Sequence, residues 1–130
     1  MKRSTTVFLL LLLSACTHGT VTATDASDGK TFMLHEGQVL RISLSSTYWQ
    51  LSDSSDPAVL ALIGSPVAHS QQSTSAGRCV PGQGCGTVTA LYRALAPGEA
   101  WVTATRVSCG EALRCTGASG RFSIDVLVKR

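Results

Sequence analysis

The sequence predicts an all-β protein with the fold of an immunoglobulin-like, antiparallel β-sandwich of about seven strands and two disulfides. Over residues 30–130 apolar residues recur with a period of two, as in strands that bury one face. Clusters of Gly, Pro, Ser and Asp separate these segments, and no segment has the periodicity of a helix. These features favour two packed sheets over a helical or mixed fold.

Residues 1–15 are predicted to be an export signal that is absent from the mature fold. Lys2 and Arg3 precede the apolar run 7–13, and the small residues Ser14 and Ala15 follow it. This order is that of a signal peptide with its basic, apolar and cleavage regions. The apolar run is far shorter than the roughly 20 residues that span a bilayer as a helix, so we expect cleavage rather than a permanent span.

The end of this segment, Leu13-Ser14-Ala15-Cys16, resembles a bacterial lipobox. The resemblance implies that Cys16 carries a diacylglycerol thioether and that the protein is extracytoplasmic, anchored by lipid to a bacterial cell membrane. An ordinary secretory signal cut nearby is the alternative. Residues 16–29 are rich in Thr and Ala and lack apolar periodicity, which predicts a lipidated N-terminus and flexible tether before a domain over residues 30–130.

Four strands are expected in the first half of this domain. Thr31–Leu34 is a short, largely apolar run, and Gln38–Leu44 alternates Leu and Ile with mostly polar residues. Tyr48–Leu51 carries Trp49 and a Leu on one face, and Val59–Ile63 is a continuous apolar run of strand length.

Three further strands are expected after a polar loop over residues 64–77. Thr87–Leu95 alternates and ends at the turn Ala96-Pro97-Gly98. Ala100–Val107 follows, and Arg121–Val128 has the clearest alternation of apolar and polar residues in the chain.

The charge of the chain excludes a nucleic-acid binder that depends on a basic surface. The sequence has 11 Lys and Arg and 8 Asp and Glu, and removal of the signal leaves nine basic residues and eight acidic ones. Such a nearly neutral domain lacks the charge that phosphate contacts require. A chain of 130 residues is also too short for several domains, and we expect a monomer.

Four cysteines remain after Cys16, namely Cys79, Cys85, Cys109 and Cys115. An even number in a small exported chain indicates disulfides. Because each successive pair encloses five residues that can turn back, we expect the local bridges 79–85 and 109–115. Bridges between the two loops remain an alternative. A zinc site is disfavoured, since its ligand spacing is usually shorter.

The sequence contains no pattern typical of an enzyme or a metal site. His18, His35 and His69 share no ligand spacing, and no nucleophile elbow, calcium loop or phosphate loop is present. We therefore expect no catalytic residues, no metal and no cofactor. Trp49 and Trp101 are expected to be core and sheet residues.

The segments Leu34–Trp49, Gly82–Gly98 and Arg121–Val126 follow one another in an order that resembles the chagasin family. Members of this family are immunoglobulin-like inhibitors of papain-like cysteine proteases. The resemblance covers nearly all of residues 30–128. It implies a sandwich in which three loops at one end form a wedge that enters the protease cleft.

The corresponding loops keep the family pattern only in part. The first keeps Thr47 and an aromatic residue before Trp49, the second is rich in Gly, and the third has Ser108-Cys109-Gly110 where the family has Arg-Pro-Trp. In the second and third loops, short disulfide-closed stretches could present a rigid binding edge. The candidate residues for protease or partner binding on the three loops are Ser46, Thr47, Tyr48, Gly82, Gln83, Gly84, Gly110, Glu111, Leu113 and Arg114.

The expected function is that of a membrane-anchored lipoprotein that inhibits papain-like cysteine proteases through these loops. The alternative is a non-inhibitory structural lipoprotein, or one that binds another protein of the bacterial envelope. In this second reading the two disulfides only stabilise a small domain.

Overall fold

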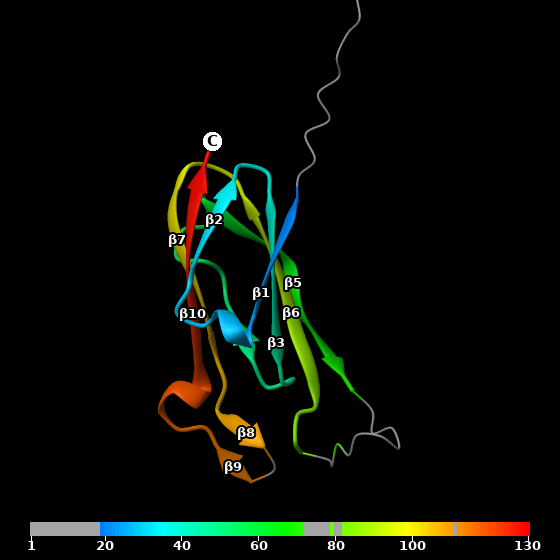
Figure 1. The fold of residues 1–130 in the computed structure, drawn as a ribbon. Helices are drawn as coiled ribbons and strands as arrows, with labels where there is room; N and C mark the ends of the chain where they lie inside the picture. The colour runs from blue at the N-terminus through cyan, green and yellow to red at the C-terminus, as the bar shows by residue number, and fades with distance from the viewer. Residues whose placement is uncertain (1–18, 72–78, 80–81, 111) are drawn as a thin grey trace, which may run out of the picture.

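Two four-stranded sheets face each other in the computed structural model, which describes residues 19–71, 79, 82–110 and 112–130 (Figure 1). The sheets are named here sheet I and sheet II. Sheet I has the strand order β1 (Thr20–Thr24), β3 (Val39–Ser45), β6 (Gly86–Ala94) and β5 (Leu60–Ser70). Sheet II has the order β2 (Thr31–His35), β10 (Arg121–Lys129), β7 (Gly98–Thr105) and β4 (Gln50–Leu51).

Three shorter features complete the fold. The strands β8 (Ser108–Gly110) and β9 (Leu113–Arg114) form a separate hairpin, and two 3-10 helices, η1 (Asp25–Ser27) and η2 (Gly117–Gly120), connect longer strands. In the described part of the chain no helix is long and apolar enough to cross a bilayer. The all-β sandwich with two disulfides that the sequence predicts is therefore confirmed.

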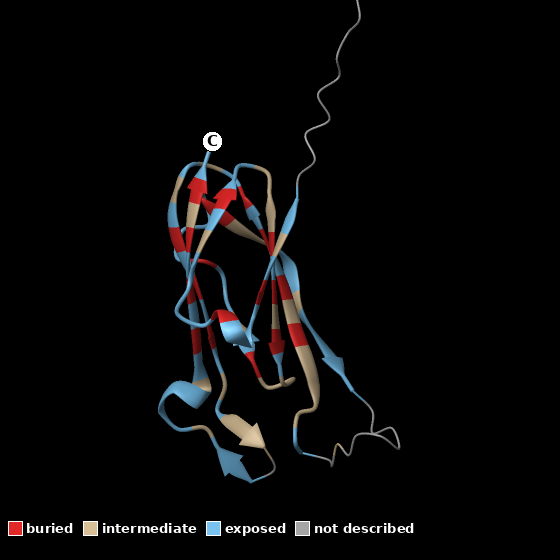
Figure 2. Cartoon of the chain, in the orientation of Figure 1, coloured by how far each residue is buried: buried red, intermediate tan, exposed pale blue. Residues whose placement is uncertain are grey.

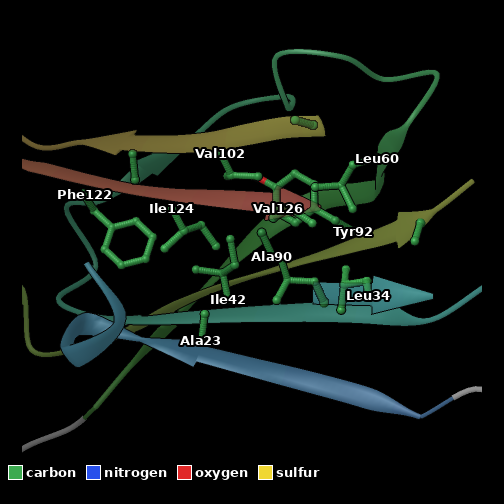
Figure 3. Close-up of a cluster of buried hydrophobic side chains, with 14 of the residues drawn as sticks. Ala23, Leu34, Ile42, Leu60, Ala90, Tyr92, Val102, Phe122, Ile124 and Val126 are labelled. Carbon is green, nitrogen blue, oxygen red and sulfur yellow. The ribbon is translucent and has the colours of Figure 1, made fainter. Parts of the chain in front are cut away.

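The core lies between the sheets and is formed by alternate residues of the long strands (Figure 2). In β10 every second residue from Phe122 to Val128 is buried, and the residues between them are exposed except for the half-buried Leu127, as the alternation predicts. Figure 3 shows Tyr92 and Ala90 of β6 pointing into the same cluster as Ile124 and Val126 of β10. This shared core fixes the two sheets against each other.

The antiparallel arrangement that the sequence predicts is wrong for two strand pairs. β1 pairs with β3 in parallel, and β2 pairs with β10 in parallel, whereas the other pairs in both sheets are antiparallel. The reason is the path of the chain. η1 turns β1 into β2, which returns to the end where β1 began, so that β3 starts beside the start of β1.

The flexible tether predicted over residues 16–29 is wrong from Thr20 onward. Residues 20–24 form β1, where Ala23 is fully buried and Val21 packs partly against the core. The Asp25 carboxylate then accepts a hydrogen bond from the Ser45 backbone N–H, at 3.0 and 3.2 Å from its two oxygens. The domain therefore begins ahead of residue 30. Residues 1–18, including the signal and Cys16, lie outside the described residues.

The polar loop predicted over residues 64–77 is also shorter than expected. β5 continues to Ser70, and its pairing with β6 is interrupted by a bulge between Ile63 and Val67. Gly64, with φ +67, makes this irregular turn possible before pairing resumes. Both faces of this part of β5 are mostly exposed, so its residues are mostly polar, and this polar composition led to the prediction of a loop.

Tyr92 is fully buried at the middle of this fold, and its phenolic O–H donates to the Ser52 carbonyl oxygen at 2.6 Å. Burial, and to a smaller extent the Asp53 carboxylate, raises the pKa of Tyr92 far above its ordinary value of 10.0. The folded state therefore holds the phenolic proton more tightly than the unfolded chain does.

This difference predicts a loss of stability in alkali. The contribution is fully present below the unfolded pKa and is lost as the pH rises above about 10. We expect Tyr92→Phe to reduce this alkaline loss. At pH 7 it should lower the free energy of unfolding by about 1 kcal/mol, because the Ser52 carbonyl loses its donor. Urea denaturation of both proteins at neutral and alkaline pH measures the effect. An unchanged alkaline loss in the variant would contradict it.

Candidate functional site

Three loops meet at one end of the sandwich, which we call the loop end (Figure 1, bottom). One joins sheet I to sheet II, one joins two strands of sheet I and one joins two strands of sheet II. The first loop is residues 46–49, the second is the described part of residues 71–85, and the third is the described part of residues 106–120. The loops meet there because of the directions of the strands. β3 and β7 end at the loop end, and their antiparallel partners β6 and β10 begin there. The start of β1 and the C-terminus after β10 lie at the opposite side.

The first and second loops are bonded to each other along their backbones. The Ser46 N–H donates to the Gly86 carbonyl oxygen at 2.9 Å, and the Thr47 N–H donates to that of Gly84 at 2.8 Å. The Tyr48 hydroxyl donates to the Gly82 carbonyl oxygen at 2.6 Å. These three bonds join the two loops into one unit.

Gly84 is required for this arrangement. Its φ is +65, and a Cβ atom added to it would lie 2.4 Å from a carbon of the Tyr48 ring. The ring therefore covers the backbone of the second loop directly. The disulfide Cys79–Cys85 closes the same loop beside this contact.

The third loop is a small hairpin closed by a disulfide. β8 pairs with β9 through Ser108 and Arg114, and Ala112 takes a φ of +53 in the turn between them. The Cys109–Cys115 bridge joins the two sides, with Cα atoms 5.0 Å apart. The structure thus has the two local bridges that the cysteine spacing predicts.

Arg106 connects this hairpin to the first loop. Its guanidinium carbon lies 4.4 Å from the centroid of the Trp49 ring, and its Nε donates to the Ser119 carbonyl oxygen at 2.9 Å. Trp49 is itself held by a hydrogen bond from its indole N–H to the Ser45 carbonyl oxygen at 3.0 Å. The predicted strand Tyr48–Leu51 is consequently wrong at its start, because Trp49 lies in the loop and only Gln50 and Leu51 form β4.

Removal of the Arg106 side chain should loosen the third loop. We expect Arg106→Ala to lower the free energy of unfolding by about 1 kcal/mol, since it removes a cation–π contact and a hydrogen bond. It should also speed hydrogen exchange at the Cys115 N–H, which donates to the Val107 carbonyl oxygen. The matched control is Arg93→Ala, at an exposed position on β6, and equal exchange in both variants would argue against the link.

The structure places nine of the ten predicted contact residues at the loop end. Leu113 is 60% exposed, and Arg114, Gly82 and Gln83 are also exposed. Ser46, Thr47, Tyr48, Gly84 and Gly110 are partly buried by the contacts between and within the loops. Glu111 lies outside the described residues.

Sequence reasoning missed Arg106 and Gly86 as parts of this end. Their roles depend on contacts with Trp49 and with the residues around Ser46 and His69, which are distant in sequence. Among the described residues, no group of three or more His, Cys, Asp or Glu side chains could hold a metal ion.

Two solved structures resemble this fold at low sequence identity. The cysteine protease inhibitor EhICP2 from Entamoeba histolytica matches with a TM-score of 0.60 and 10% identity, over 85% of this chain and 96% of its own. Amebosin matches with a TM-score of 0.57 and 14% identity, over 84% of this chain and 97% of its own. No family profile matches the sequence, and no curated protein is similar to it in sequence. The chain therefore shares its fold with a known cysteine protease inhibitor, as the chagasin-family resemblance implied.

Proposed function

We propose that this chain is a lipid-anchored lipoprotein of the bacterial envelope whose loop end binds and inhibits papain-like cysteine proteases. The observation that carries the proposal is the meeting of three loops from both sheets at the end remote from the start of β1. The fold shared with a cysteine protease inhibitor supports the same assignment.

The loop end is suited to binding because it is held in shape before any partner arrives. Thr47 and Tyr48 fasten the first loop to the second, and the disulfide Cys109–Cys115 closes the third. A surface that is already ordered loses little conformational entropy on binding. Loops that are held by hydrogen bonds and disulfides are also poor protease substrates, because their chain cannot extend through a catalytic cleft.

Leu113 is the strongest candidate for an anchoring contact. It stands 60% exposed in the hairpin of the third loop, beside the exposed Arg114. A partner that covers this apolar side chain removes it from water, and the neighbouring Arg is of a type that is enriched among the residues that dominate the energy of an interface. Gly82 and Gln83 of the second loop are exposed at the same end.

The position of β1 supports an outward-facing loop end. Lipid on Cys16 would lie four positions before Thr20 in the chain, a distance that spans at most about 14 Å when fully extended. The domain would thus stand close to the membrane, with the loop end directed away from it.

Titration of residues 17–130, exported without the lipid, against papain tests the inhibition. We expect hydrolysis of a fluorogenic peptide to slow at micromolar protein. Leu113→Ala combined with Arg114→Ala should weaken this effect at least tenfold, which corresponds to about 1.4 kcal/mol. The control is Leu95→Ala, a residue 49% exposed in the turn at the opposite end. Unchanged hydrolysis with the wild-type protein would contradict inhibition of this protease class.

Incorporation of labelled fatty acid tests the anchor separately. The mature chain should gain the mass of the lipid, and Cys16→Ala should abolish that gain. A labelled Cys16→Ala chain would contradict lipidation at this residue.

A non-inhibitory envelope lipoprotein is the second candidate, and one observation favours it. The first loop uses its polar groups internally, since the Ser46, Thr47 and Tyr48 N–H groups all donate within the loop end. Few donors are left there for a protease. Binding to an envelope protein, with papain activity unaffected, would support this reading.

A further inference from the structure

The outward face of sheet I is basic and partly apolar. Arg41 of β3 lies opposite Leu91 of β6, which in turn lies opposite Ile63 of β5, and Arg93 is two residues further along β6. Ile63 is 37% exposed, Leu91 is 38% exposed and Val67 is 51% exposed. None of the four strands of this sheet contains an acidic residue. Arg41 and the three apolar side chains line one shallow hollow.

The outward face of sheet II has the opposite character at its centre. Trp101 of β7 is 56% exposed and lies opposite Asp125 of β10, while Glu99 lies opposite Leu127. These four side chains line a second hollow. Met33, 59% exposed, extends the apolar row onto β2.

Neither carboxylate at this centre is neutralised within the described part of the chain. Glu99 and Asp125 make no ion pair or side-chain hydrogen bond with any described residue. The basic residues on the same face, Arg121 and Lys129, lie at the two ends of β10. The centres of the two outward faces therefore differ in charge, with Arg side chains on sheet I and carboxylates on sheet II, although the total charge is nearly neutral.

We propose that these two faces bind each other, so that sheet I of one molecule seats on sheet II of a second copy. A guanidinium group from Arg41 or Arg93 would stack on the Trp101 indole and pair with the flanking carboxylates of Glu99 and Asp125. The same contact would cover the exposed apolar side chains of sheet I and those of sheet II.

Charge complementarity and the distribution of apolar residues both favour a second copy as the occupant. Of the eight large apolar side chains that are exposed in the described part of the chain, five lie on these two faces. They are Met33, Ile63, Val67, Leu91 and Trp101. Because the contact joins two different surfaces, it is heterologous and extends into rows rather than closing as a symmetric dimer. This association differs from the monomer that the sequence leads us to expect, and it does not depend on protease inhibition.

Sedimentation equilibrium of the exported full chain tests the proposal, in a density-matched detergent with micelles in excess over protein. We expect the average mass to rise with protein concentration and to fall with added salt. Arg41→Glu with Arg93→Glu, or Glu99→Lys with Asp125→Lys, should each leave a monomer. Trp101→Ala should weaken association at least tenfold.

Mixing the two charge-reversed variants gives the decisive measurement. The first variant has acidic residues on both faces, and the second has basic residues on both faces. Each face of one variant is therefore complementary in charge to a face of the other, and association should return. The control is Glu36→Lys, an exposed position in the turn after β2, which should associate as the wild type does. Circular dichroism melts confirm that each variant is folded. A wild-type monomer at every soluble concentration, association that survives both reversals, or a mixture that stays monomeric would each overturn the proposal.

Discussion

Gly86→Ala is expected to lower the free energy of unfolding by about 3 kcal/mol or more. Gly86 has a φ of +130, and a Cβ atom there would lie 2.0 Å from the His69 carbonyl oxygen. The obstacle is backbone, so no side chain can move aside. Gly86 also pairs with Ser70 and accepts the Ser46 N–H, and relief of the clash would break this pairing between β5 and β6. Urea denaturation monitored by tryptophan fluorescence measures the loss.

Gly29→Ala is the matched control for this prediction. Gly29 also has a positive φ, +74, but nothing lies within 4 Å of the position that a Cβ would take. Only backbone strain remains, with an expected cost of about 1 kcal/mol. Equal losses for Gly86→Ala and Gly29→Ala would show that the contact with His69 is unimportant.

Leu40→Ala is expected to cost about 3 kcal/mol. Leu40 is fully buried in β3, with Val21 of β1 as its register partner on one side and Tyr92 of β6 on the other. Truncation removes apolar contacts and leaves a cavity between strands that are fixed by their pairing, so the site cannot collapse freely. Thermal and chemical denaturation measure the change.

Leu113→Ala provides the comparison for the core truncation. The same atoms are removed from a side chain that is 60% exposed at the loop end, and the expected loss of stability is within about 0.5 kcal/mol. A large loss for Leu113→Ala would show that the hairpin contributes to the core. A small loss for Leu40→Ala would argue against the pairing of β1 with β3.

The long strands were predictable because their alternation reflects a single buried face. Arg121–Val128 corresponds to β10 almost residue for residue, and Thr87–Leu95 corresponds to most of β6. β1 was not predictable, because only Ala23 of its five residues is buried and its pairing with β3 is a tertiary contact. The alternation of apolar and polar residues does not reveal a strand such as β1, which is stabilised mainly by its pairing with β3.

At the loop end, the two disulfides were predictable because they follow from the spacing of the cysteines in the sequence. Five residues between cysteines favour local bridges, and the structure has them. The contact of Arg106 with Trp49 joins residues far apart in the sequence, and no local pattern indicates it. Trp101 was expected in the sheet, where it lies, but its outward orientation depends on the register of β7.

The parallel pairing of β1 with β3 has a mechanical consequence for an anchored protein. A pull from the membrane would enter β1 at Thr20, whereas a partner held at the loop end would pull on β3 at Ser45, its opposite end. The two strands would then be loaded in shear, and their five register pairs would share the force at the same time. An antiparallel first strand would instead be peeled away one pair after another. If Cys16 carries the proposed lipid, the strand that replaces the expected tether would resist force along the axis from that lipid to a partner at the loop end.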